Sequence, residues 1–203
     1  MPDMNKKKKL LLHSCCGPCS TAVLERLYPD YDITVFFYNP NITDPEEYEH
    51  RLSEQERFIS EWKPGEITLI KGEYDPKVYL DFVSGLEDEP EGGARCTKCF
   101  MLRMEEAARF AKEHGFECFD TTLTVSPYKN SKIIMPVGIQ MGEKYGIEYI
   151  EGNYKKKDGY RRSVELSKEY GLYRQHYCGC EFSKRDALPE DENGMPIRQG
   201  KSE

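Results

Sequence analysis

The fold is decided by the stretch Lys9-Leu10-Leu11-Leu12-His13-Ser14-Cys15-Cys16-Gly17-Pro18-Cys19. Its first six residues form a largely apolar run that predicts a short buried strand, and the pattern over about 20–28 predicts a helix. Three cysteines lie in the turn between them. Two further pairs follow, Cys96/Cys99 and Cys178/Cys180, and of the eight cysteines only Cys118 stands alone. This spacing suggests a metal or redox centre assembled from distant parts of one chain.

Strand and helix patterns then alternate along the chain. Apolar and β-branched residues predict strands over 32–38, 66–70, 118–125 and 147–150. Helices are expected from Pro45 to Pro64-Gly65, over about 76–83, from a cap at Thr97 to Gly115, up to Tyr145 and over 160–170. Pro136 lies inside the helix that reaches Tyr145, which should therefore start late or bend. The alternation predicts one α/β domain over 8–185, a parallel, Rossmann-like sheet with helices on both faces.

The first two cysteine groups are expected at the same edge of this sheet. Cys15 and Cys16 follow the first strand directly, and Cys96 and Cys99 begin a helix. In parallel sheets ligands bind beyond the carboxyl ends of the strands, where helices begin. Four thiolates are the ligands of a four-iron cluster or of a structural zinc site. Ligand softness alone does not separate these two kinds of site, so a zinc-stabilised binding module stays an alternative.

The remaining cysteines favour several chemistries. Cys16-Gly17-Pro18-Cys19 matches the active-site tetrapeptide of thioredoxins, which keeps a thiol–disulfide oxidoreductase open. The length of the chain and its lack of antiparallel strands count against that class. Cys178-Gly179-Cys180 has one intervening residue, so a disulfide there would be strained and easily reduced, as in a two-electron redox pair. Two more metal ligands or idle thiols are the alternative for that pair.

Two further residues near these groups have plainer explanations. Cys118 lies in a predicted strand, where a cysteine usually acts as a small buried hydrophobe. His13 ends the first strand and is expected to be hydrogen-bonded rather than chemically active.

Composition describes a soluble globular protein. The 203 residues are 38% hydrophobic and 32% charged, and no apolar run is long enough for a signal peptide or a membrane helix. The expected location is therefore the cytoplasm, where cysteines serve as ligands or redox catalysts rather than as structural disulfides. Residues 186–203 are rich in acids, proline and glycine and are predicted to form a disordered acidic tail.

Charge gives a mixed indication about nucleic acid. The net charge of −7 argues mildly against it, although a local basic segment can still bind RNA. The segment Tyr154–Arg162 holds five basic residues and two tyrosines, which is typical of an RNA contact and equally of a solvated helix start. The chain contains neither a Gly-x-x-x-x-Gly-Lys loop nor a Gly-x-Gly-x-x-Gly motif, so nothing in it supports nucleotide binding.

Taken in order, these segments resemble the QueH family of epoxyqueuosine reductases over about residues 9–183. The resemblance is carried by five segments: His13-Ser14-Cys15-Cys16-Gly17-Pro18, Phe36-Phe37-Tyr38-Asn39-Pro40-Asn41-Ile42, Arg95-Cys96-Thr97-Lys98-Cys99, Thr121 through Asn130, and Lys156 through Cys180. It implies an adenine nucleotide alpha hydrolase-like fold. The implied activity is the reduction of the epoxide of epoxyqueuosine, in the anticodon of a tRNA, to the alkene of queuosine.

The same resemblance implies roles for individual residues. It implies a [4Fe-4S] cluster on Cys15, Cys16, Cys96 and Cys99, a redox-active Cys178/Cys180 pair, and an additional iron nearby. Many members carry an aspartate at the position of Cys19; if that residue helps to hold the additional iron, Cys19 makes the site softer. Substrate contacts are expected from rim loops and from the basic segment: Tyr38, Asn39, Lys129, Asn130, Lys156 and Lys157. The expected partners are tRNA and an electron donor that the sequence does not identify, with no membrane.

Overall fold

The computed structural model describes residues 6–185, so the predicted acidic tail lies outside the described part of the chain. Its centre is a five-stranded sheet in the order β3-β2-β1-β4-β5, and all four strand pairs are parallel. The strands are β1 (Lys8–His13), β2 (Tyr31–Phe37), β3 (Thr68–Lys71), β4 (Cys118–Thr121) and β5 (Glu148–Tyr149). The predicted parallel α/β sheet is confirmed.

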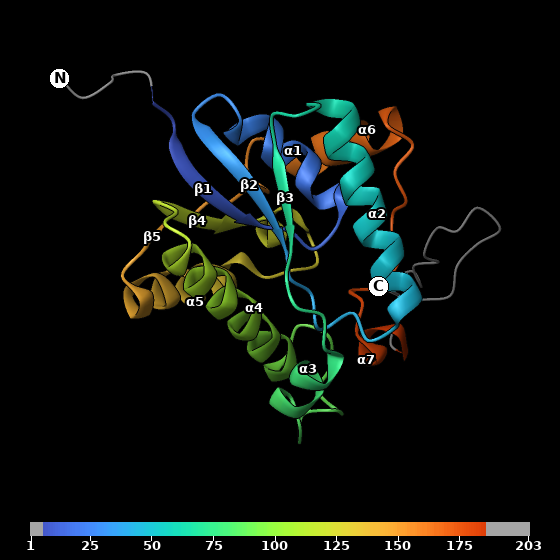
Figure 1. Ribbon diagram of the computed structural model, residues 1–203. Coiled ribbons are helices and arrows are strands. Elements are labelled where there is room, and N and C mark those ends of the chain that lie inside the picture. The colour runs from blue at the N-terminus through green and yellow to red at the C-terminus, as the bar shows by residue number, and fades with distance from the viewer. Residues whose placement is uncertain (1–5, 186–203) are drawn as a thin grey trace.

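Helices cover both faces of the sheet (Figure 1). One face carries α1 (Gly17–Leu27), with α2 (Pro45–Trp62) and α6 (Gly159–Glu169) packed against it. The other face carries α4 (Ala94–Glu113) and α5 (Ser131–Tyr145). Two shorter helices flank them: α3 (Pro76–Phe82) packs on α4, and α7 (Glu181–Arg185) lies beside the start of α2. No helix within residues 6–185 has the length and apolarity needed to span a membrane.

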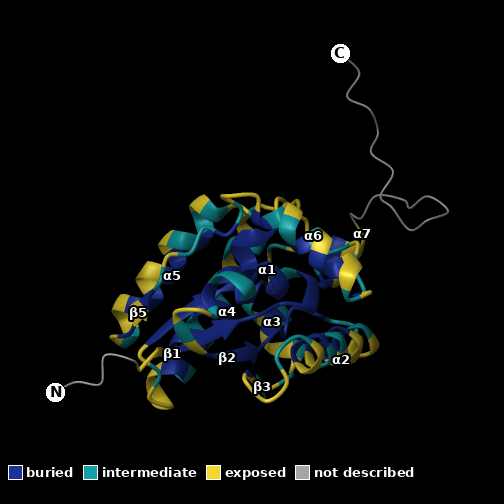
Figure 2. Ribbon diagram, turned by 90° about the horizontal axis from the view of Figure 1, so that it is seen from above, coloured by how far each residue is buried: buried dark blue, intermediate teal, exposed yellow. Residues whose placement is uncertain are grey.

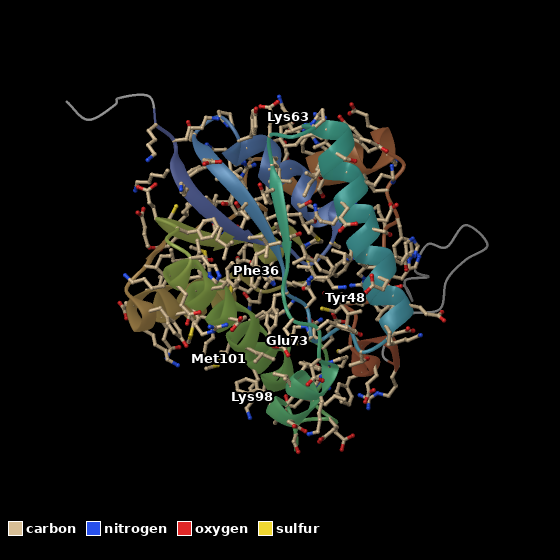
Figure 3. All side chains as sticks on the ribbon, viewed as in Figure 1. Phe36, Tyr48, Lys63, Glu73, Lys98 and Met101 are labelled. Carbon is tan, nitrogen blue, oxygen red and sulfur yellow. The ribbon has the colours of Figure 1, made fainter. Side chains whose placement is uncertain are left out.

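Successive side chains of β1 point to opposite faces of the sheet and so enter both layers of the core. Leu10 and Leu12 join the layer of α1 and α2, whereas Leu11 joins the layer of α4 and α5. All three are fully buried, and each contributes about 1.5–3 kcal/mol by leaving water. Phe36 from β2 packs into the second layer (Figure 3), where its ring stacks on Phe110 of α4. The central strands are accordingly dark in the burial view, and exposed residues collect on the outer faces of the helices (Figure 2).

Several element boundaries differ from the prediction, and three of them bear on the site. Strand β4 ends at Thr121, whose Oγ1 accepts the N–H of Leu123 at 3.2 Å, and a 3₁₀ helix, η1 (Thr122–Val125), follows instead of more strand. Helix α4 has its N-cap at Gly93 rather than Thr97. Thr97 lies inside the helix, where its hydroxyl donates back to the Gly93 carbonyl at 3.3 Å. Helix α5 begins at Ser131, and the exposed Pro136 is accommodated within it.

Candidate metal and redox site

Three thiols meet where the strand order turns, at the carboxyl ends of β1 and β4. The Sγ atoms of Cys15, Cys16 and Cys19 all lie within 4.8 Å of one another, with 3.8 Å between those of Cys15 and Cys16. From η1, directly after β4, the hydroxyl of Thr122 lies 3.9 Å from the sulfur of Cys15. A ligand in a sheet of this kind binds at such a switch point. The triad therefore lies at the usual ligand-binding position of this kind of fold.

Local sequence explains how the triad forms. Cys16 is the N-cap of α1, Pro18 stands in the first turn where its missing N–H costs nothing, and Cys19 follows Cys16 by one helical turn. A Cβ at Gly17 would lie 3.3 Å from the carbonyl oxygen of Glu54, so glycine lets α2 approach the start of α1 closely. The same turn that begins α1 thus brings three sulfurs to one point.

Hydrogen bonding divides the charge of the triad unequally. The thiols of Cys16 and Cys19 hydrogen-bond to Cys15 and hold its pKa well below the ordinary value. Their own pKa values rise in consequence, to about 11 for Cys16. Within the triad, Cys15 is therefore the thiol that ionises most readily, and Cys16 and Cys19 hold their protons more tightly. A thiophilic metal would displace those protons on binding.

The other two cysteine groups lie side by side near this triad. Cys99 and Cys180 belong to one buried apolar cluster, and Cys96 packs against the cluster that contains Cys15 and Cys16. Burial raises the pKa of Cys96, and that of Cys99 to about 12. Backbone N–H groups reach two of these sulfurs: Gly92 donates to Cys96 and Ser183 to Cys180, at 3.2 and 3.3 Å. Such bonds stabilise negative sulfur.

Lys98, one of the two residues between Cys96 and Cys99, takes no part in these contacts. Lys98 is exposed and donates to the carbonyl oxygen of Phe82 at 3.2 Å, at the outer end of α4 (Figure 3).

A buried arginine links the cysteine groups. The side chain of Arg103 is almost wholly enclosed, and none of the carboxylates in residues 6–185 forms an ion pair with it. Its Nη1 donates to Asn39 Oδ1 at 3.4 Å, and its Nη2 has no hydrogen-bond partner. Burial lowers the pKa of Arg103, but its electrostatic interaction with Cys99, Cys178 and Cys15 raises it more.

Lys129 is partly exposed, and its amine responds to the same sulfurs: burial lowers its pKa, while Cys178, Cys15 and Cys19 raise it by more. The charge of Arg103 needs an anion nearby, since an unpaired buried charge is strongly destabilising, and the partly exposed Lys129 adds a second positive charge. The donor set and its surroundings fit a thiolate-bound metal group. Clustered soft thiolates suit iron–sulfur clusters and zinc, and such a group would be the anion that Arg103 and Lys129 face.

The closest thiol grouping is not the predicted set of four. It contains Cys19 in place of Cys96 and Cys99, because Cys19 stands one helical turn after Cys16 whereas the other two arrive from α4. The iron ligation expected of Cys15, Cys16, Cys96 and Cys99 stays a prediction. His13 and Cys118 behave as expected. The ring of His13 is buried and bonded to Thr121 Oγ1 and to the Tyr38 carbonyl, and Cys118 is fully buried in β4.

The predicted substrate contacts lie around this site in different environments. Tyr38 is 8% exposed and packs in the core, and Asn39 is buried, with its Nδ2 donating to the Ser14 carbonyl at 2.9 Å. Asn130 caps α5 by accepting the N–H of Lys132. These three side chains support the fold around the site. Contact with substrate stays a prediction for them and for Lys129.

The basic segment differs from the expectation at one end. Tyr154 is 3% exposed and its hydroxyl bonds Asp120, because the chain turns inward after β5, so this tyrosine belongs to the core and not to an RNA-facing stripe. Arg161 and Arg162 both pair with carboxylates. The two lysines predicted to contact substrate, Lys156 and Lys157, are exposed.

A strap after α6 brings the last cysteine pair to the site. We use this name for residues 170–178, which run along α2 toward its start. The α2 side chains bind its backbone in order: Arg57 binds the carbonyl oxygens of Tyr170 and Gly171, Glu54 the N–H of Tyr173, and Arg51 the carbonyl oxygens of Tyr177 and Cys178. From the same strap, Gln175 Nε2 lies 2.9 Å from the Cys16 sulfur. The strap thereby touches the triad directly.

Arg51, Arg103 and Gln175 were not anticipated from sequence. The two arginines occupy core-facing positions of their helices, Arg51 among Tyr48, Leu52 and Gln55 and Arg103 next to Met104. A cation at an apolar helix position is a detectable signal for a buried anionic partner. Gln175 lies in an irregular segment and gives no comparable signal.

Comparisons with known proteins agree with this geometry. A family model described as "Epoxyqueuosine reductase QueH" matches residues 10–186. The protein of that name from Staphylococcus epidermidis is 42% identical over 183 residues, covering 88% of this chain and 77% of the relative. Those from Streptococcus pyogenes and Thermotoga maritima are 44% and 37% identical over 182 and 177 residues, covering 88% and 86% of this chain and 71% and 89% of the relatives.

Among solved structures, the U34-tRNA thiolase NcsA from Methanococcus maripaludis with its [4Fe-4S] cluster is similar in fold. The TM-score is 0.51 at 14% sequence identity, and the match covers 90% of this chain and 64% of the thiolase. The adenine nucleotide alpha hydrolase-like fold expected from sequence agrees with this likeness. On the family model and on relatives that are 42% and 44% identical over 88% of this chain, the chain belongs to the epoxyqueuosine reductase QueH family.

Proposed function

We propose that the chain reduces the epoxide of epoxyqueuosine in the anticodon of a tRNA to the alkene of queuosine. Family membership supports the reaction, and one observation carries the chemistry. Three cysteine groups surround two cations, Arg103 and Lys129, at the carboxyl ends of the parallel strands. Such a site suits the binding of an electron-carrying metal group beside a pair of thiols.

The proposed ligands of a [4Fe-4S] cluster are Cys15, Cys16, Cys96 and Cys99, with Cys19 beside them for an additional iron. When bound, these groups would supply single electrons and a Lewis acid for an oxygen atom. Iron and sulfide separate the thiolates of a cluster, so its ligands need not touch one another. The contribution of Arg103 is to neutralise the negative charge of the thiolates inside the fold, where water cannot.

Cys178 and Cys180 are proposed to provide the reducing equivalents. Loss of the epoxide oxygen breaks two C–O bonds, forms one C=C bond and consumes two electrons and two protons. Two thiols supply both when they close a disulfide, leaving one water as product. Gly179 between them has φ +122°, a conformation that glycine adopts readily and other residues rarely do. An external electron donor must reopen the disulfide before the next turnover.

Anaerobic purification and metal analysis test this proposal. We expect a brown protein with matched iron and acid-labile sulfide that converts epoxyqueuosine to queuosine in tRNA. Colourless protein with zinc would instead support a zinc-stabilised binding module. Metal-free protein that reduces disulfides would support a thiol–disulfide oxidoreductase, although the all-parallel sheet does not have the antiparallel strands of a thioredoxin.

Two serine variants separate the proposed ligand roles. Cys96→Ser should lower iron and sulfide together, because it removes a cluster ligand. Cys19→Ser should keep the four-iron signal in low-temperature EPR and lose at most the additional iron. The opposite result, with the cluster lost in Cys19→Ser and kept in Cys96→Ser, would assign the cluster to the closest thiol triad.

A further inference from the structure

Tyr128 is the most exposed large apolar side chain within residues 6–185, with 62% of its surface accessible. It lies in the loop 126–130, which directly follows η1 at the carboxyl end of β4. Its neighbour in sequence is Lys129, and electrostatic interaction with Cys178, Cys15 and Cys19 raises the pKa of that lysine. Most of this aromatic ring is exposed beside the candidate site, so it offers apolar surface on which a ligand can pack.

The loop that carries this ring is held in place by several hydrogen bonds. The backbone N–H of Tyr128 donates to Ser126 Oγ at 3.3 Å, and that of Lys129 to the Ser126 carbonyl at 3.3 Å. On its far side Asn130 caps α5. The amine of Lys155 donates to the carbonyl oxygen of Lys129. A ring on a preformed loop loses little conformational entropy when it binds.

The surroundings of the loop are basic, although the whole chain is acidic. Residues 121–142 contain no aspartate or glutamate, in a chain of net charge −7. Lys155 links the loop to the lysine run 155–157. Just before that run, Asn153 Nδ2 lies 3.5 Å from the Oγ of Ser131, the first residue of α5. Lys132, Lys156 and Lys157 are exposed. This local excess of positive charge is what a phosphate backbone requires.

We propose that Tyr128 is a stacking platform for an unpaired base of the anticodon loop, with Lys132, Lys156 and Lys157 on the flanking phosphates. The inference rests on the proposed function and adds a recognition residue to it. Proteins that read single-stranded RNA stack its splayed bases on aromatic rings and neutralise its backbone with basic residues. Duplex RNA offers no free base face, so the platform selects the loop over the stem.

The test measures binding of a fluorescent anticodon stem–loop RNA at low and high salt. Stacking does not depend on salt, so Tyr128→Ala should weaken binding about tenfold at both concentrations. Tyr128→Phe keeps the ring and should bind like the wild type. The double variant Lys156→Ala/Lys157→Ala should lose affinity mainly at low salt and flatten the salt dependence. Val78→Ala, at an exposed apolar position on α3, is the matched control and should change nothing.

Wild-type affinity in Tyr128→Ala would overturn the stacking assignment, and so would an equal loss in Tyr128→Phe and Tyr128→Ala. Both results leave the proposed reaction standing, since the wild type still binds the RNA in each. Failure of the wild type to bind the stem–loop at any salt concentration would instead remove the proposed tRNA substrate, and the platform with it.

Discussion

The guanidinium of Arg51 donates from Nη1 to the carbonyl oxygen of Cys178 at 3.0 Å. Its Nη2 donates to the preceding carbonyl, that of Tyr177, at 3.1 Å, and its Nε pairs with Glu47 at 2.6 Å. Only 1% of this side chain is exposed, so the bonds form away from water and are stronger than surface bonds. A Cβ on Gly179 would come within 3.2 Å of the same guanidinium. Arg51 therefore holds the backbone of the last cysteine pair from α2.

Arg51→Met should release this pair without removing any thiol. We expect turnover to fall about ten- to hundredfold, the usual effect of losing a residue that orients a reactive group, while the iron content stays unchanged. Loss of charged, buried hydrogen bonds should also lower the free energy of unfolding by about 2–4 kcal/mol. Steady-state turnover, iron analysis and urea titration measure these three quantities.

Arg57→Met is the matched control for the arginine variant. Arg57 binds the other end of the strap, at Tyr170 and Gly171, and is partly exposed. It should cost some stability and leave turnover near that of the wild type. Equal loss of turnover in both variants would mean that the strap matters as a whole and that Arg51 has no special role in placing Cys178.

Cys178→Ser should keep its metal and stop multiple turnover. A serine cannot close a disulfide with Cys180, so the two-electron step proposed for this pair becomes impossible. Iron and sulfide analysis together with product counting over several turnovers checks the prediction. Cys118→Ala is a suitable control, because Cys118 lies in β4 away from the site, and it should remain active. Loss of iron in Cys178→Ser would identify the residue as a metal ligand instead.

Gln175→Ala should lower the reduction potential of a metal group bound at Cys16. The N–H···S bond at 2.9 Å stabilises negative charge on that sulfur, and the reduced state carries more of it. One hydrogen bond of ~1 kcal/mol corresponds to about 40 mV for a one-electron couple. EPR-monitored redox titration of the variant against Gln140→Ala, an exposed position on α5, measures the shift. An unchanged potential would show that the bond does not tune the group.

The sequence allowed prediction of the elements and of the edge at which the cysteines lie. Apolar runs such as 9–14 and 32–38 locate central strands because burial on both faces leaves few other interpretations. The carboxyl-end rule then places Cys15 and Cys16 beside the start of a helix. The short β4 was not predictable in the same way, because a single hydroxyl, that of Thr121, ends it.

The other features that the sequence did not predict depend on contacts between segments far apart in the chain. The strap depends on four side chains of α2 that meet residues more than a hundred positions later. Nothing local to Gln175 marks it as a neighbour of Cys16. Tyr154 looked like part of a surface stripe because its basic neighbours are exposed, whereas its own ring turns inward to a buried carboxyl. Such partners follow only from the three-dimensional arrangement.

That carboxyl belongs to Asp120, and it makes stability depend on pH. Asp120 is fully buried at the end of β4, and burial raises its pKa to about 7, although Tyr154, Thr121 and Gly152 all donate to it. In the unfolded chain the group titrates near its ordinary value, about 3.9. Between these values the folded state binds more protons than the unfolded state. Stability must then decrease as pH rises through this interval and level off above it.

Asp120→Asn removes this titration while keeping an oxygen that accepts hydrogen bonds. The wild type should lose up to about 1.4 kcal/mol per pH unit between about pH 5 and pH 7 from this one group, and the variant should lack that slope. Urea unfolding of the metal-free protein at several pH values, with both proteins in the same buffers, measures the difference. Parallel curves for the two proteins would mean that Asp120 is ionised throughout and that its three donors compensate for its burial.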